Sequence, residues 1–164
     1  MWAYDPRVDR SPVSPSWVKK WQRSWDVLEE EYIPDRELRI GAMLDVVEAA
    51  VGDAPTVLDL GCGTGTITSR LLERFPLAHA IAVDVDPVLL TIASATFAED
   101  DRVRIVHADL RDPSWVDAVP EQVDAALTAT ALHWLPEGAV RRLYVDLVPW
   151  FDAAESSRTL RRCR

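Results

Sequence analysis

The sequence predicts an α/β fold in which a mostly parallel sheet lies between helices and is preceded by further N-terminal helices. Two observations support this class. From residue 56 onward, short apolar runs of strand length alternate with longer amphipathic segments, the order that produces parallel strands joined by helical crossovers. Before residue 53, apolar residues recur at three- and four-residue spacing, which is typical of helices.

Residues 1–52 are predicted to form an irregular arm followed by helices. Residues 1–15 are rich in proline, serine and charge. Large apolar residues then recur on one helical face at Trp17, Trp21, Trp25, Leu28 and Tyr32. We interpret this stripe as a face that packs into the core, with a lid over a ligand site as the alternative. A second helix is expected after Pro34, to about Ala50, with Gly52 placed to end it.

Four strands are expected within residues 53–149, at 56–60, 79–84, 102–108 and 123–129. The first is followed by a helix that Pro76 ends. The second is followed by a helix through about Ala98, for which Asp86 supplies the N-cap and Pro87 the first residue. A short helix is expected near 113–119, and a final helix from about Pro136 to Leu147. The order of strands and helices predicts right-handed crossovers within one domain.

Composition excludes several classes of function. A formal net charge of −9 argues against a nucleic-acid-binding role, because that role needs a clustered basic surface. No apolar run approaches the length of a membrane span, and residues 1–17 lack the pattern of a secretory leader, so we expect a cytoplasmic protein without membrane contact. The two cysteines, Cys62 and Cys163, have no metal-ligand spacing, and no metal site is predicted.

The stretch "VLDLGCGTGTIT", residues 57–68, places three alternate glycines directly after the first strand. Glycine lets a ligand approach the backbone, and the start of the following helix offers unpaired N–H groups. A dinucleotide-binding turn would need a small residue at position 66, where Thr66 stands, which argues against a nicotinamide-dependent dehydrogenase. Parallel sheets bind ligands at the carboxyl ends of their strands, so acidic residues at these ends become candidates for the site.

The run Asp59-x-Gly61-x-Gly63-x-Gly65 resembles motif I of the class I S-adenosylmethionine-dependent methyltransferases. Acidic residues at the ends of the next two strands and the segment "VDAALTATALHWL" match later motifs of that family. The resemblance covers residues 56 to about 147 and implies a Rossmann-like three-layer sandwich with strands ordered 3-2-1-4. It also implies S-adenosylmethionine as the cofactor and a small molecule as the methyl acceptor.

The resemblance assigns roles to individual residues. Asp59 would organise the glycine turn near the cofactor's methionine ammonium, Asp84 would accept the ribose hydroxyls, and Asp109 would face the adenine amino group beside Leu110. The segment from Thr128 would run beneath the methyl-donor end. The implied cofactor-binding residues are Asp59, Gly61, Cys62, Gly63, Gly65, Asp84, Asp109, Leu110 and Thr128.

Structural interpretations remain open beside these roles. Asp59 could serve only to hydrogen-bond the turn, Asp84 could be an ordinary strand-end residue, and Asp109 could cap a helix. His133 follows the fourth strand and is the candidate general base, because histidine titrates near neutral pH. Methyl transfer needs a base only when the acceptor must lose a proton, so a structural role for His133 is the alternative.

The resemblance ends near Pro149, where the family has a glycine-containing turn and a fifth strand. Here "WFDAAESSRTLRRCR" follows, and residues 151–164 contain four arginines and two acids. We interpret residues 150–164 as an atypical basic tail produced by truncation or frameshift, which would leave the domain at 53–149 incomplete. The fourth strand would then be an open edge available for self-association. Alternatives to an active methyltransferase are a non-catalytic cofactor-binding remnant or interaction module, and an aminopropyltransferase.

Overall fold

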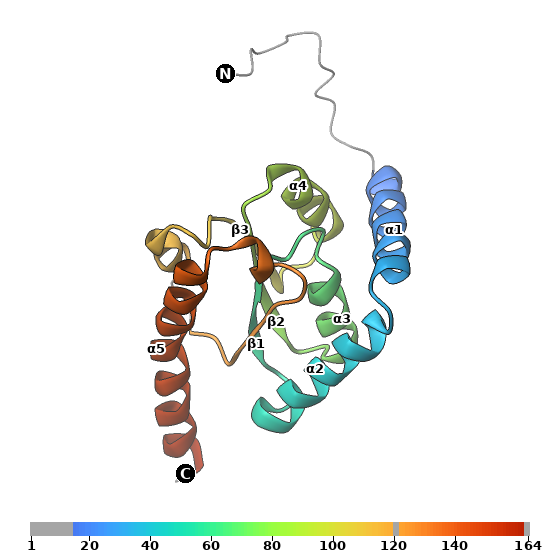
Figure 1. Ribbon diagram of the computed structural model, residues 1–164. Helices are drawn as coiled ribbons and strands as arrows, with labels where there is room; N and C mark the ends of the chain where they lie inside the picture. Colours follow the sequence, from blue (N-terminus) through green and yellow to red (C-terminus); the bar gives the residue numbers. More distant parts are fainter. Residues whose placement is uncertain (1–14, 120–121, 163–164) are drawn as a thin grey trace.

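The computed structural model describes residues 15–119 and 122–162, so all but the last residue of the arm expected at 1–15 lies outside them (Figure 1). Its helices are α1 (Pro15–Tyr32), α2 (Arg36–Val51), α3 (Thr66–Arg74), α4 (Pro87–Thr96) and α5 (Glu137–Arg162). Two short 3₁₀ helices are η1 (Pro113–Ala118) and η2 (Leu132–Trp134). The strands are β1 (Thr56–Leu60), β2 (His79–Asp84), β3 (Val103–His107) and β4 (Ala125–Leu127).

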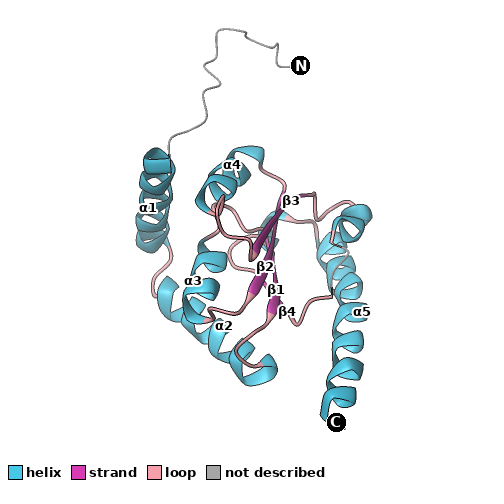
Figure 2. Cartoon of the chain, turned by 180° about the vertical axis from the view of Figure 1, so that it is seen from behind, coloured by secondary structure: helices cyan, strands magenta, loops and turns pink. Residues whose placement is uncertain are grey.

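The four strands form one parallel sheet in the order β3-β2-β1-β4, which confirms the predicted fold class and strand order. On β1, Val57 lies opposite Ala80 of β2 and Ala125 of β4. Helices α2, α3 and α4 lie on one side of the sheet, and η1 with α5 lies on the other (Figure 2). All four strands therefore end at the same edge, where the glycine turn after β1 also lies.

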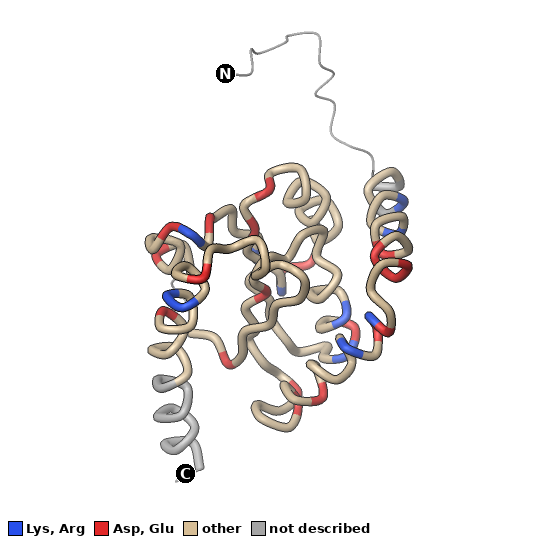
Figure 3. Tube along the Cα trace, viewed as in Figure 1, with Lys and Arg blue, Asp and Glu red and all other residues tan. Residues whose placement is uncertain are grey.

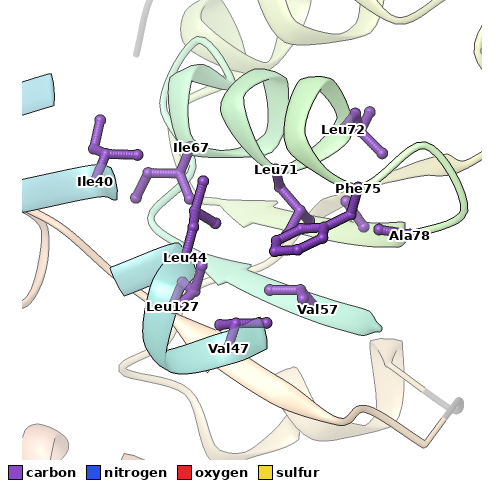
Figure 4. Packing of buried hydrophobic residues seen from close by; sticks show 11 residues of the cluster. Ile40, Leu44, Val47, Val57, Ile67, Leu71, Leu72, Phe75, Ala78 and Leu127 are labelled. Carbon is purple, nitrogen blue, oxygen red and sulfur yellow. The ribbon is translucent and has the colours of Figure 1, made fainter. Parts of the chain in front are cut away.

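One core cluster fills the space between the sheet and helices α2 and α3 (Figure 4). Helix α2 buries residues four and three apart, and α3 buries its own apolar face opposite them. The labelled members are Ile40, Leu44, Val47, Val57, Ile67, Leu71, Leu72, Phe75, Ala78 and Leu127. This packing fixes the start of α3, and with it the glycine turn, against the sheet.

The second core cluster lies on the opposite face of the sheet, around Trp115 of η1. Leu143 and Leu147 of α5 are buried in it, and the Trp115 indole donates a 3.3 Å hydrogen bond to Asp146. Trp150 meets the Trp115 ring edge-on at a centroid distance of 5.4 Å. The first half of α5 is therefore anchored to the sheet by apolar packing.

Helix α5 does not end where the sequence pattern predicted. The expected end at Leu147 is wrong, because the helix continues through Pro149 to Arg162. Proline has no backbone N–H, so the carbonyl of Val145 loses its helical hydrogen bond there, but the residues on either side keep helical geometry. The residues after Pro149 are mostly compatible with a helix, so the arginine-rich segment continues α5.

The stripe of large apolar residues predicted on α1 does not pack into the core as a whole. Trp17, Trp21, Leu28 and Tyr32 are between 46% and 77% exposed, so the core interpretation is wrong for these four residues. Trp17 and Trp21 instead contact each other at 5.5 Å between ring centroids. The face of α1 turned toward α3 and α4 is largely polar, with Val18 fully buried and Gln22 hydrogen-bonded to the Thr96 hydroxyl at 3.0 Å.

Acidic and basic segments lie side by side where α2 and α3 meet (Figure 3). Arg70 pairs with Glu37 at 2.9 Å, and Arg74 pairs with Asp45 at 2.7 Å. These exposed pairs join the two helices at their solvent side, where such contacts contribute little to stability. Within the part of the chain that the structure describes, no helix is long and apolar enough to cross a membrane.

Candidate functional site

A cavity of about 670 Å³ opens at the carboxyl ends of the strands. Its floor is the glycine turn after β1, and its sides are the segments that follow β2, β3 and β4. Helix α1 and the start of α2 form the remaining wall. Of the residues predicted for the site, the lining includes Gly61, Cys62, Gly63, Asp84, Asp109, Leu110 and His133.

The glycine turn has left-handed backbone geometry at all three glycines, with φ of 71° at Gly61, 57° at Gly63 and 90° at Gly65. A β-carbon at Gly61 would lie 2.3 Å from Cβ of Ala131, and one at Gly65 would lie 2.5 Å from the Phe97 ring. A β-carbon at Gly63 would meet nothing within 4 Å. Gly61 is therefore required by packing, a β-carbon at Gly65 would have to displace the Phe97 ring, and Gly63 leaves space in the cavity.

The carboxylate of Asp84 is fixed at the end of β2 by two backbone N–H groups. Gly63 donates to one oxygen at 2.8 Å, and Asp86 donates to the other at 2.9 Å. Asp86 itself caps α4 by accepting from Val88 and Leu89, as its sequence context predicted. Asp84 is thus tied to the glycine turn, and each of its oxygens keeps a further lone pair directed elsewhere.

Asp109 lies at the end of β3 in a bidentate ion pair with Arg111. The Arg111 guanidinium donates to both carboxylate oxygens, the shortest contact being 2.7 Å, and the Arg111 N–H adds a bond of 2.9 Å. These hydrogen bonds hold the pKa of Asp109 below its usual value. Leu110 between them is buried in the second core cluster. Asp109 remains charged in the wall of the cavity.

Asp59 lies behind the glycine turn rather than in the cavity lining. It is 1% exposed, and one carboxylate oxygen accepts from the Thr68 hydroxyl at 2.7 Å and the Thr68 N–H at 3.2 Å. Its other oxygen has no hydrogen-bond partner among the described residues. Burial raises the pKa of Asp59 to about 6, against the lowering effect of Thr68. The carboxylate therefore stabilises the start of α3 at an electrostatic cost.

Three other predicted residues contribute differently to the site. Gly65 and Thr128 are not in the cavity lining, and the Thr128 hydroxyl is buried without a partner among the described residues. Cys62 lines the cavity with its side chain 7% exposed, and burial raises the pKa of its thiol. The thiol is therefore protonated and packed. The backbone N–H of Cys62 donates to the carbonyl of Val83 at 3.0 Å.

The segment after β4 carries His133 into the cavity wall. His133 and Trp134 belong to η2, and their ring centroids lie 4.9 Å apart. Thr130, just before η2, has a left-handed φ of 56°, which is strained for a β-branched residue. This strained turn brings η2 from the end of β4 to the mouth of the cavity.

Several lining residues come from α1 and the start of α2, and sequence reasoning did not identify them as site residues. They are Trp25, Glu29, Tyr32, Ile33 and Arg36. Asp26 accepts a 2.7 Å bond from the Thr66 hydroxyl and pairs with Arg36 at 3.4 Å, so it connects this wall to the glycine turn. The available signal was the helical spacing of Trp25, Glu29 and Tyr32, which the lid alternative used only in part.

Comparison with known proteins identifies the family. The sequence pattern of a methyltransferase domain family matches residues 57–149, more than half of the chain. The chain belongs to this family. Its resemblance to S-adenosylmethionine-dependent methyltransferases is therefore confirmed, and S-adenosylmethionine is the cofactor of the family. Within the described residues, no group of three or more potential ligands could hold a metal ion.

Individual methyltransferases are similar over parts of their length. A trans-aconitate 2-methyltransferase of Azoarcus sp. is 34% identical over 71% of this chain and 43% of its own length. A release factor glutamine methyltransferase of Cereibacter sphaeroides is 37% identical over 95% of this chain and 57% of its own length. The chain therefore spans about half the length of these relatives.

Solved structures support the fold. An amino pentose methyltransferase from Micromonospora echinaspora superposes with a TM-score of 0.61 at 23% identity, over 76% of this chain and 50% of that one. A TehB-like methyltransferase from Corynebacterium glutamicum gives a TM-score of 0.55 at 23% identity, over 82% and 66%. Both likenesses establish the Rossmann-like methyltransferase fold.

Proposed function

We propose that this chain binds S-adenosylmethionine in the cavity at the carboxyl ends of its strands and transfers the methyl group to a small-molecule acceptor. The observation that carries the proposal is the contact between the glycine turn and Asp84, whose carboxylate is held by Gly63 at 2.8 Å. The open space at Gly63 fits a ligand that contacts backbone. A relative named for trans-aconitate supports a small acceptor.

The lining supplies a partner for each part of the cofactor. We infer that Asp84 accepts the ribose hydroxyls, and that Asp109 and Leu110 contact the adenine, since they follow the next strand. Gly61, Cys62 and Gly63 would approach the cofactor with their backbone, as Gly61 and Cys62 are anchored to Val83. Arg36 lines the wall and pairs with Asp26, which accepts from Thr66 at the start of α3, so we infer that its guanidinium binds the methionine carboxylate.

The remaining predicted residues would act from behind the lining. We infer that Asp59 and Gly65 shape the turn, through the Thr68 bonds and the close contact with Phe97. Thr128, directly after β4, would support the methyl-donor end. These roles use no direct contact with the cofactor, which matches their absence from the lining.

Bound S-adenosylmethionine would supply a methyl group already activated by its sulfonium. The chain's contribution would be to hold the acceptor in line with that methyl and to exclude water. His133, at the cavity mouth on η2, would take a proton from the acceptor where the acceptor must lose one. In this scheme, replacement of His133 lowers the rate without weakening cofactor binding.

The ribose role of Asp84 can be tested by calorimetric titration with S-adenosylhomocysteine. Asp84→Ala should weaken binding by about tenfold or more, since it removes a charged hydrogen-bond acceptor. Asp84→Asn keeps an oxygen for the Gly63 N–H and so separates loss of the turn contact from loss of charge. Asp86→Asn, which preserves the helix cap, is the control and should bind as the unmodified chain does. Equal affinity in all four proteins would contradict the ribose assignment.

A second candidate is an interaction module, favoured by the edge of the sheet. Among the described residues, β4 pairs only with β1, and its outer edge carries no strand. We infer that this edge permits self-association. We also infer that the chain and its methyltransferase activity are located in the cytoplasm. Sedimentation at increasing protein concentration should show dimers under this alternative. A monomer at all concentrations that binds S-adenosylhomocysteine would favour the methyltransferase over the module.

A further inference from the structure

The wall that α1 contributes to the cavity carries one acidic side chain between two aromatic rings. Trp25 precedes Glu29 by four residues and Tyr32 follows it by three, so the three side chains share one face of the helix. Trp25 and Glu29 are half-buried, and Tyr32 is exposed at the rim. Trp134 of η2 also lines the cavity, is 79% exposed and presents a further ring.

The other charges of the cavity already have partners. Arg111 is paired with Asp109 at 2.7 Å, Arg36 is paired with Asp26 at 3.4 Å, and the Asp84 carboxylate accepts two backbone N–H groups. Among the described residues, no hydrogen bond or ion pair engages the Glu29 carboxylate. Among the described residues, Glu29 is thus the charged side chain of the wall that has no hydrogen-bond or ion-pair partner. Arg111 is paired with Asp109, and Arg36 is assigned to the methionine carboxylate of the cofactor, so neither guanidinium is left for an anionic acceptor.

We propose that the methyl acceptor carries a protonated amine, which Glu29 binds while Trp25, Tyr32 and Trp134 surround it. A carboxylate attracts an ammonium group, and aromatic faces add cation–π attraction at the same place. The apolar Ile33 beside them suits a hydrocarbon or ring attached to the amine. This substrate class rests on the proposed function, because it assumes that the cofactor occupies the glycine-turn end of the cavity.

The experiment is a set of calorimetric titrations on the full chain saturated with S-adenosylhomocysteine. The cationic probe is 2-phenylethylamine, and the anionic probe of similar shape is 3-phenylpropionate. We expect the amine to bind about tenfold more tightly than the carboxylate, as for a charged contact in a partly buried site. Glu29→Gln should remove this preference. Glu30→Gln changes the same charge on the exposed, neighbouring position of α1 and should keep the preference.

Each outcome distinguishes the inference from the function on which it rests. Failure of S-adenosylhomocysteine to bind the unmodified chain would overturn the proposed function and the acceptor class together. Binding of S-adenosylhomocysteine with no preference for the amine, or with neither probe bound, would overturn the acceptor class alone. The same holds if Glu29→Gln weakens S-adenosylhomocysteine itself and leaves the amine unaffected, because Glu29 would then serve the cofactor. Circular dichroism checks that both variants are folded.

Discussion

At the scale of single residues, Gly61 and Gly63 have similar backbone angles but different surroundings. Both are left-handed, yet only the position of Gly61 is closed by a neighbouring side chain, Ala131. The spacing of glycines in the sequence identified the turn but could not separate these two requirements. The distinction depends on Ala131, which lies 70 residues further along the chain and reaches the turn only in the fold.

This difference yields a paired prediction. Gly63→Ala should fold with a loss of about 1–2 kcal/mol from left-handed geometry, and its methyl group should weaken S-adenosylhomocysteine binding by entering the cavity. Gly61→Ala adds a clash with Ala131 and should destabilise the fold by about 3 kcal/mol or more. Urea unfolding and calorimetry measure the two effects. Unchanged affinity in Gly63→Ala would show that the ligand does not approach this backbone.

Asp59 makes stability depend on pH in an identifiable direction. Its pKa is raised to about 6 in the folded chain, so the folded state holds the proton more tightly than the unfolded state. The tighter binding of this proton stabilises the folded state. The stabilisation is fully present below the ordinary pKa of 3.8 and is lost as pH rises to about 6. The loss amounts to about 3 kcal/mol, from about 1.4 kcal/mol per pKa unit.

Asp59→Asn removes this titration while keeping an oxygen for Thr68. The stability of the variant relative to the unmodified chain should therefore increase between about pH 4 and pH 6 and stay constant above that range. Urea denaturation at a series of pH values measures the difference. If the difference in stability between the two proteins does not change with pH, then burial does not destabilise the charged form of Asp59, which contradicts the prediction.

At the scale of elements, the alternation of apolar strands and amphipathic helices was sufficient to predict β1 to β4, α3 and α4 in order, and apolar spacing alone predicted α2. The position of α1 was not predictable in the same way, because its contacts with α3 and α4 are largely polar. Gln22 and Asp26 face α3 and α4, and periodicity of apolar residues gives no weight to such residues. The extension of α5 beyond Leu147 was also not predicted, because the residues after Pro149 carry no regular apolar spacing.

The attachment of α1 depends on Asp26. Asp26→Ala would leave the Thr66 hydroxyl and Arg36 without their acceptor, so α1 should open more readily, by about 1–2 kcal/mol. Amide hydrogen exchange should become faster in α1 and stay unchanged in β1 and β2. Glu31→Gln, on the exposed side of α1, is the control. Equal acceleration in the sheet would indicate global destabilisation and contradict a local role.

At the scale of the whole molecule, the fold brings together residues that are separated by more than a hundred positions. Trp25 and His133 line one cavity, although they come from opposite ends of the described chain. Motif spacing could predict that Asp84 and Asp109 line the same cavity as the glycine turn, because parallel strands share an edge. It could not predict the wall formed by α1, whose position depends on hydrogen bonds between side chains.

The central claim is that this cavity holds the cofactor, and NMR titration of the isotope-labelled chain with S-adenosylhomocysteine tests it most directly. Amide signals of the glycine turn and of Asp84, Asp109 and Leu110 should shift on saturation, together with those of α1 around Glu29. Signals from β4's outer edge and the far end of α5 should not move. A titration that leaves the glycine turn and Asp84 unchanged, or that shifts signals only outside the cavity, would contradict the claim.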